Sequence, residues 1–120
     1  MGDGDHGWAA AEFLSLVRDM FVRESPEGLV LLSGVPTAWF RAGRPFSVVD
    51  APTDHGMVSV GVAFREGDAV VKWSVRPVSH QEKARCILSM PGDGARVRRT
   101  LEGDGGEILV RIADMPKESR

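Results

Sequence analysis

The sequence predicts one mainly β domain, an antiparallel β-sandwich of about seven or eight strands preceded by one amphipathic helix. Two observations predict this fold. Two alternating runs in residues 57–75, each with one uniformly apolar side, flank a Glu66-Gly67-Asp68 turn, which is typical of a β-hairpin. From residue 28 onward, other short apolar runs recur between turn signals at intervals of about 8–12 residues, as in sandwiches and barrels.

Length and composition fit a single domain. At 120 residues the chain can bury one core but not two. We expect a flexible lead-in at 1–7, a helix at 8–24, the β-sandwich at 28–113 and a tail at 114–120. The net charge of −2 argues against nucleic-acid or anionic-membrane binding through bulk electrostatics. No apolar run approaches the roughly 18 residues of a membrane span and no secretory signal is visible, so we expect a soluble chain of unknown compartment.

The predicted helix carries an unusually wide apolar face. At helical spacing this face spans about 160°, wider than the stripe of roughly 100° that packing on one surface requires. Ser25-Pro26 is expected to end the helix. We expect the excess apolar surface to form an interface, either in a two-fold homodimer or with a partner domain. The interface residues would be Phe13, Leu14, Leu16, Val17, Met20 and Phe21.

Everything after the helix is expected to be β structure. A turn at Glu27-Gly28 precedes the first apolar run. The segment that contains Trp39 and Phe40 falls within this β region, and no second helix is expected. The strand signals lie at 29–32, 46–49, 58–64, 71–75, 86–90, 97–101 and 108–112.

Motifs for catalysis or metal binding are weak. The only histidines are His6, His55 and His80, and they show neither the helical HxxxH nor the strand HxH spacing of metal ligands. No Gly-x-Ser-x-Gly elbow or comparable nucleophile context supports Ser/His/Asp catalysis. We therefore nominate no catalytic residue, no metal site and no cofactor.

Two further groups have a chemical and a structural interpretation. Cys86, the single cysteine, lies on an alternating apolar face, which favours a buried inert thiol over a nucleophile. Arg96, Arg98 and Arg99 could clamp an anion. A solvated strand face with one arginine turned inward or to an edge is the simpler interpretation.

The three tryptophans could stack on sugar rings, because a flat apolar ring matches the C–H side of a pyranose. For Trp73 a core position is favoured, since it belongs to the apolar side of the hairpin. For Trp8 and Trp39, the sequence allows both core packing and sugar contact. If Trp8 and Trp39 are exposed, the chain could be an autonomous carbohydrate-binding module.

Several motifs follow one another in a set order, carried by residues 5–13, 18–24, 29–32, 35–39 and 51–59. The first contains a His-Gly-Trp sequence and leads into the amphipathic helix. This order resembles the C-terminal end of glycoside hydrolases and related proteins that are built on an (α/α)6 barrel. The resemblance covers nearly the whole chain.

The resemblance implies a non-catalytic role. In such proteins the last barrel helix leads into a small appended β-sandwich, and the acid and base carboxylates lie in upstream barrel segments. This chain would then be an accessory or structural domain, and its helix would pack on a missing (α/α)6-barrel partner. His6 and Trp8 would lie on the substrate side, which with Trp39 gives three candidate substrate-binding residues. An independent small hydrolase is the weakest alternative, since glycoside hydrolysis needs two carboxylates that flank one cleft.

Overall fold

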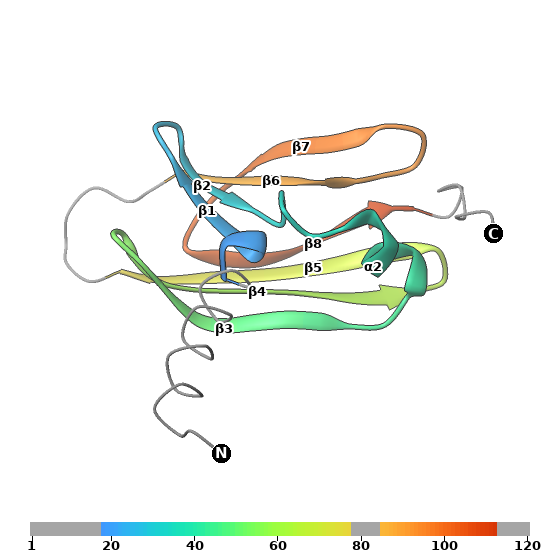
Figure 1. The fold of residues 1–120 in the computed structure, drawn as a ribbon, viewed down its shortest axis with the longest axis horizontal. Coiled ribbons are helices and arrows are strands. Elements are labelled where there is room, and N and C mark those ends of the chain that lie inside the picture. The colour runs from blue at the N-terminus through green and yellow to red at the C-terminus, as the bar shows by residue number, and fades with distance from the viewer. Residues whose placement is uncertain (1–17, 78–84, 113–120) are drawn as a thin grey trace, which may run out of the picture.

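The computed structural model describes residues 18–77 and 85–112. In this part of the chain, eight strands form two four-stranded sheets that lie face to face (Figure 1). The strands are β1 (Val22–Ser25), β2 (Gly28–Leu31), β3 (Phe46–Thr53), β4 (Gly56–Arg65), β5 (Asp68–Pro77), β6 (Cys86–Pro91), β7 (Arg96–Leu101) and β8 (Gly105–Arg111). One sheet has the order β1-β2-β6-β7 and the other β3-β4-β5-β8. The predicted fold class, a mainly β sandwich, is confirmed.

The hairpin β4–β5 is the centre of the second sheet. Its strands pair at ten positions, from Gly56 opposite Pro77 to Arg65 opposite Asp68. The two residues of the loop, Glu66 and Gly67, both have positive φ, at 44° and 87°. This is the pattern of a type I′ turn, whose twist matches that of the flanking strands. The hairpin predicted from the alternation is therefore confirmed.

The core lies between the two sheets. The inward positions of the hairpin contribute valines and Trp73, and the facing sheet contributes leucines and Met90. Among the most completely buried side chains are Leu29, Leu31, Leu88, Met90, Val58, Val60 and Val71. Burying apolar surface stabilises by about 25 cal/mol per Å², so this layer supplies the main driving force for folding.

One strand pairing departs from the antiparallel scheme. β2 pairs with β6 in parallel, from Leu29 opposite Cys86 to Leu31 opposite Leu88. The other five pairings are antiparallel. Parallel neighbours need a long crossover connection, and here the chain between them forms β3, β4 and β5 of the opposite sheet. Periodicity reports which side of a strand is buried and carries no information on this pairing.

The helix ends earlier than the sequence predicts. Helical residues end at Phe21, and Val22–Ser25 forms β1 instead of the last helical turn. A tight turn accounts for this, because the Ser25 hydroxyl donates to the Gly28 carbonyl at 3.1 Å and accepts from the Glu27 N–H at 3.2 Å. β1 then pairs antiparallel with β2. The predicted helical residues 8–17, the lead-in and the tail from 114 lie outside the described residues.

A second, short helix was not expected. α2 spans Thr37–Ala42, between Pro36 with φ −61° and Gly43 with φ 70°. The Gly43 N–H donates to the Phe40 carbonyl, which closes the helix end at a left-handed glycine. A helix of six residues is too short to show a 3.6-residue period, so its proline start and glycine stop were the only available signals.

Candidate functional site

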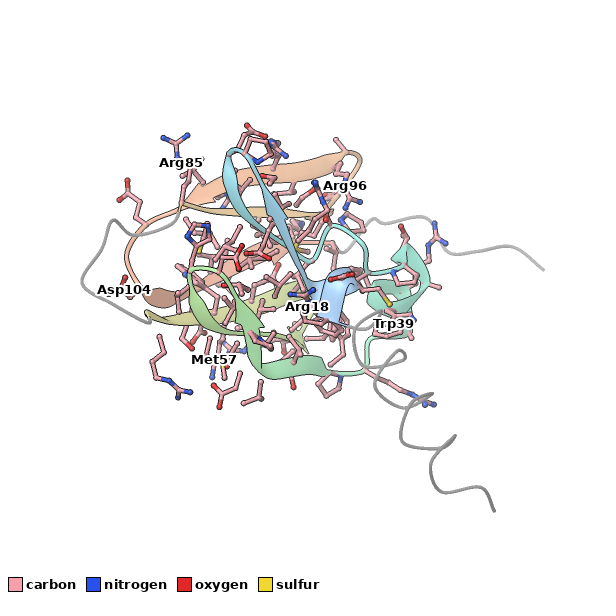
Figure 2. The ribbon with its side chains drawn as sticks, turned by 60° about the vertical axis from the view of Figure 1, so that its left-hand side comes forward. Arg18, Trp39, Met57, Arg85, Arg96 and Asp104 are labelled. Atoms are coloured by element: carbon pink, nitrogen blue, oxygen red, sulfur yellow. The ribbon has the colours of Figure 1, made fainter. Side chains whose placement is uncertain are left out.

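The described end of the first helix, residues 18–21, is fastened to the sandwich. The last carbonyls of a helix have no intrahelical donor, and here the loop after β2 supplies the donors. Figure 2 shows Arg18 at this junction. The hydrogen bonds run from Gly34 N to Met20 O (3.0 Å), from Leu32 N to Phe21 O (2.7 Å) and from Arg18 Nη1 to Pro52 O (2.9 Å).

Gly34 permits a close approach at this junction. A Cβ atom at Gly34 would lie 2.9 Å from the Met20 Cα and 3.3 Å from the Met20 carbonyl oxygen. Both are backbone atoms, so a side chain at this position would force the helix end and the loop apart. The absence of a side chain at residue 34 therefore sets the distance between helix and sandwich.

An aromatic cluster lies beside the junction and joins the helix end to α2, β3 and β4. Phe46 is its centre, with ring centroids 5.8 Å from Phe21, 5.5 Å from Trp39, 5.3 Å from Phe40 and 6.3 Å from Phe64. The first three contacts are edge-on, the arrangement that the quadrupoles of aromatic rings favour. Through the contacts of Phe21 with Trp39 and Phe46, the cluster packs the helix end against the sandwich.

The predicted interface is only partly described. Phe13, Leu14, Leu16 and Val17 lie outside the described residues. Met20 is half-buried and packs against the core. Phe21 differs from the expectation of exposed interface surface, because it is only 2% exposed. The aromatic cluster covers its ring, so Phe21 belongs to the core of this domain.

Of the predicted substrate-binding residues, His6 and Trp8 also lie outside the described residues. Trp39 is 36% exposed and lies on α2 at the edge of the aromatic cluster (Figure 2). Its indole contacts Phe21 and Phe46 with ring edges, at 6.2 and 5.5 Å between centroids. Trp39 therefore combines a packing role with partial exposure to solvent.

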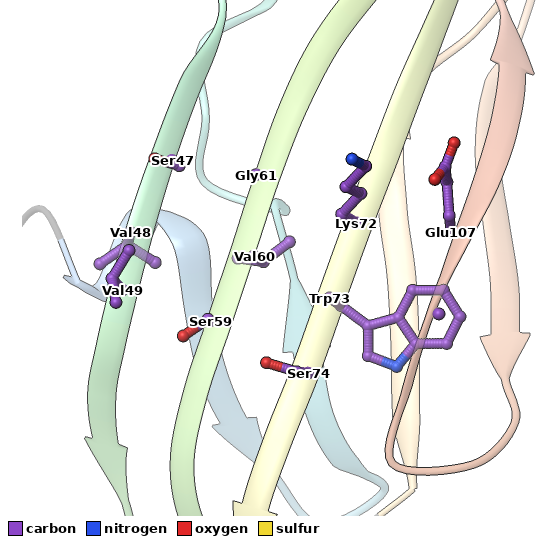
Figure 3. Close-up of a pocket in the computed structure, with 11 residues that line it drawn as sticks. Ser47, Val48, Val49, Ser59, Val60, Gly61, Lys72, Trp73, Ser74 and Glu107 are labelled. Atoms are coloured by element: carbon purple, nitrogen blue, oxygen red, sulfur yellow. The ribbon is translucent and has the colours of Figure 1, made fainter.

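The outer face of the sheet β3-β4-β5-β8 carries an open hollow of about 620 Å³ (Figure 3). Small residues form its floor, because Ser59, Gly61 and Ser74 occupy outward positions in the middle of the sheet. A second depression of about 280 Å³ adjoins the hollow and shares Ser47, Gly61 and Lys72 with it. The two together form a shallow groove across the sheet, which we call the outer groove.

One pair of opposite charges borders the outer groove. Lys72 and Glu107 are direct register partners on β5 and β8 and so share one face of the sheet. In the described part of the chain, neither side chain forms an ion pair or a hydrogen bond. The groove therefore presents one ammonium group and one carboxylate side by side.

A bulge in β3 forms the opposite rim. The register of β3 against β4 shifts between Val48 and Ala51, and Asp50 has a positive φ of 54°. The Asp50 N–H donates to the Ser59 hydroxyl at 2.9 Å, which stabilises the bulge. As a result, Val49 is 72% exposed at the edge of the outer groove.

Trp73 underlies the groove from the core side. It is 7% exposed, which confirms the predicted core position. Its indole lies against Gly106 of β8, where a Cβ atom would come within 2.8 Å of the ring. The Trp73 Nε1 is buried and has no hydrogen-bond partner in the described structure.

Cys86 is buried in the core, as the sequence predicts. Burial raises the pKa of its thiol, and the negative charge of Asp104 acts in the same direction. Because the thiolate is the nucleophilic form of cysteine, this environment disfavours reactivity.

The three arginines of β7 have different surroundings. Arg96 donates to the Ser89 hydroxyl at 3.1 Å and to the Ser33 carbonyl at 3.1 Å. Arg98 forms an ion pair with Glu27 at 2.9 Å. Arg99 is exposed on this edge strand. Arg96 and Arg98 therefore tie β7 to neighbouring segments, and the three do not converge on one anion-binding point.

Within residues 18–77 and 85–112, no group of three histidine, cysteine, aspartate or glutamate side chains could hold a metal ion. Over the same residues, no helix has the length and apolar character needed to span a membrane. Comparison of the chain with protein-family models, with curated proteins and with solved structures finds no match.

The sequence interpretation missed the outer groove. The signal was the polar side of the alternation, where small residues rather than long polar ones follow one another along β4. Four strands contribute to the floor and walls, and only their register brings Ser47, Gly61, Lys72 and Glu107 into one row.

Proposed function

We propose that this chain is a non-catalytic accessory β-sandwich that holds a preceding helical domain in a fixed orientation. The resemblance to the C-terminal part of (α/α)6-barrel glycoside hydrolase-like proteins suggests this role. The observation that supports it most directly is the fastened helix end at residues 18–21, with its capped carbonyls and the close approach at Gly34.

A fixed orientation follows from the number of independent contacts at the junction. Two backbone hydrogen bonds and one from Arg18 hold the helix end, and each contributes about 0.5–1.5 kcal/mol net. Phe21 adds two ring contacts, each worth about 0.5–1.5 kcal/mol beyond area burial. Any pivot of the helix about Val22 would lose several of these contacts together. These contacts therefore fix the orientation of a helix that enters the sandwich here.

The decisive experiment joins the chain to the polypeptide that its upstream coding sequence specifies. We expect that sequence to encode an (α/α)6 barrel, and we expect the joined protein to unfold at a higher temperature than the barrel alone. Gly34→Ala in the joined protein should remove part of that gain, whereas Glu102→Gln, an exposed position away from the junction, should not. A barrel that is equally stable and active without this chain, or an upstream sequence without a barrel, would contradict the proposal.

The isolated chain should also lack glycosidase activity. Purified protein would be incubated with a broad panel of aryl glycosides, and no turnover above the buffer rate is expected. Turnover that scales with protein concentration and survives removal of the purification tag would contradict the non-catalytic role.

A further inference from the structure

The main hollow of the outer groove, on the sheet β3-β4-β5-β8, has the size of a small-molecule site, and none of its lining residues makes a junction contact. Ligand sites usually measure about 300–1,000 Å³, and the main hollow has about 620 Å³. The main hollow takes lining residues from all four strands, β3, β4, β5 and β8, and the adjoining depression continues it along β3, β4 and β5. The main hollow therefore suits a ligand that lies across the strands.

The polar groups of the groove suit a ligand whose own groups both donate and accept hydrogen bonds. Lys72 can only donate and ionised Glu107 can only accept, while the Ser47 and Ser74 hydroxyls do both. Neighbouring strands lie about 4.8 Å apart, so Lys72 and Glu107 can engage two adjacent groups of one ligand. Adjacent hydroxyl groups fit this pair, because one can accept from the ammonium while the other donates to the carboxylate.

The charge balance of the lining argues against an ionic ligand. Lys72 and Glu107 are the only charged residues among those that line the described hollow, and their charges cancel. An anion would meet the Glu107 carboxylate, and a cation would meet the Lys72 ammonium. A neutral ligand avoids both conflicts. The exposed Val49 at the rim offers an apolar contact for the C–H groups of such a ligand.

A second protein surface fits the groove less well. A specific protein interface takes about 20–30 residues from each partner, whereas 11 residues line the hollow. Two copies that met through this face would place one hollow against another and enclose a void, which forfeits packing contacts.

We propose that the outer groove binds a neutral oligosaccharide, with Lys72 and Glu107 hydrogen-bonded to adjacent hydroxyl groups. This site uses the sheet face and not the tryptophans considered from the sequence. The proposal does not rest on the accessory role, and each can fail without the other.

The test is a titration of the ¹⁵N-labelled full chain, followed by amide chemical shifts. The probes are maltohexaose, cellohexaose, xylohexaose, laminarihexaose and mannohexaose. Each is added to about 10 mM, so that binding is detected even when the dissociation constant is in the millimolar range. We expect at least one probe to cause saturable shifts that centre on the amides of Ser47, Gly61 and Lys72.

Variants then assign the binding to the two charged groups. Lys72→Met and Glu107→Gln should each weaken binding of that probe about tenfold, as expected for loss of a hydrogen bond to a charged group. The matched control Glu102→Gln, at an exposed position outside the groove, should bind like the unaltered chain. Ser47→Ala is a second groove variant with a smaller expected loss, and it serves if a charge variant perturbs the amide spectrum elsewhere.

Three results would overturn the proposal. In the first, none of the five probes shifts the groove amides. In the second, a probe binds but the groove variants keep the affinity of the unaltered chain, or the shifts centre on Trp39 instead. In the third, the groove amides shift with protein concentration alone, which would assign this face to contact between two copies of the chain.

Discussion

Replacing Gly34 by alanine tests the junction on which the proposed function depends. The added Cβ would lie 2.9 Å from the Met20 Cα, closer than real Cβ atoms approach other atoms. Gly34 does not have a positive φ, so the backbone itself accepts alanine without strain. The perturbation is therefore a local overpacking between the helix end and the loop after β2.

The expected loss of stability follows from three contributions. Overpacking typically costs about 1–3 kcal/mol, and weakening the hydrogen bond from Gly34 N to Met20 O costs about 0.5–1.5 kcal/mol. Alanine also restricts the unfolded chain, which offsets about 0.4–1 kcal/mol. The centre of these ranges is a net destabilisation of about 2 kcal/mol, which lowers the urea midpoint by about 1 M.

The assay combines urea unfolding, followed by tryptophan fluorescence, with amide hydrogen exchange. In the Gly34→Ala variant, the amides of Leu32 and residue 34 should lose protection more than those of the β4–β5 hairpin. Gly43→Ala is the control, because no atom lies within 4 Å of its added Cβ but its φ is 70°. That control should lose about 1–2 kcal/mol from left-handed strain while the junction amides keep their protection.

A Gly34→Ala variant with unchanged stability and fully protected junction amides would refute this reasoning. Such a result would mean that the helix end does not approach the loop as closely as the structure shows. The proposed rigid attachment would then lose its main support.

Three other predictions concern the core and the helix. Gly106→Ala should destabilise the domain by about 1–3 kcal/mol and change Trp73 fluorescence, because the Cβ meets the indole; equal urea midpoints would contradict this. The folded-state pKa of Cys86 is raised above its ordinary value of 9.0. The stability that the protonated thiol contributes is therefore fully present below that pH and is lost as pH rises through the folded pKa. The Cys86→Ala chain should lack this alkaline loss, and an equal loss of unfolding free energy with rising pH in both chains would contradict the prediction. If the helix face is an interface, Leu14→Asp should dissociate the dimer, as measured by light scattering, and leave the domain folded. Phe21→Asp should unfold the domain, because Phe21 is buried. A folded Phe21→Asp chain would contradict the core position.

Local periodicity predicted those parts of the fold whose structure depends on neighbouring residues. The β4–β5 hairpin followed from the strict alternation in 57–75 and from a glycine turn, since both signals lie within one short stretch. The boundary at Phe21 did not, because Val22–Ser25 fits a helical face as well as a strand. What decides in favour of β1 is its pairing with β2, which is a tertiary interaction.

The elements that bring distant residues together could not be predicted. The parallel pair β2–β6 joins strands that are separated by the whole of β3, β4 and β5. The outer groove depends on the same kind of information, because Ser47, Gly61, Lys72 and Glu107 come from four strands. The burial of Phe21 likewise requires Trp39 and Phe46, which approach it only in the folded chain.

The turn at Glu66-Gly67 controls both sides of the sheet. Because side chains alternate along a strand, a slip of one residue in the β4–β5 register would move each side chain of β5 to the opposite face of the sheet. Lys72 would then turn toward the core and Val71 toward solvent, which would bury an unpaired charge and expose an apolar residue. The positive φ angles of Glu66 and Gly67 fix a two-residue loop and so exclude that slip. One local turn therefore places Trp73 in the core and Lys72 on the outer groove, so the stability of the domain and the proposed binding surface depend on the same register.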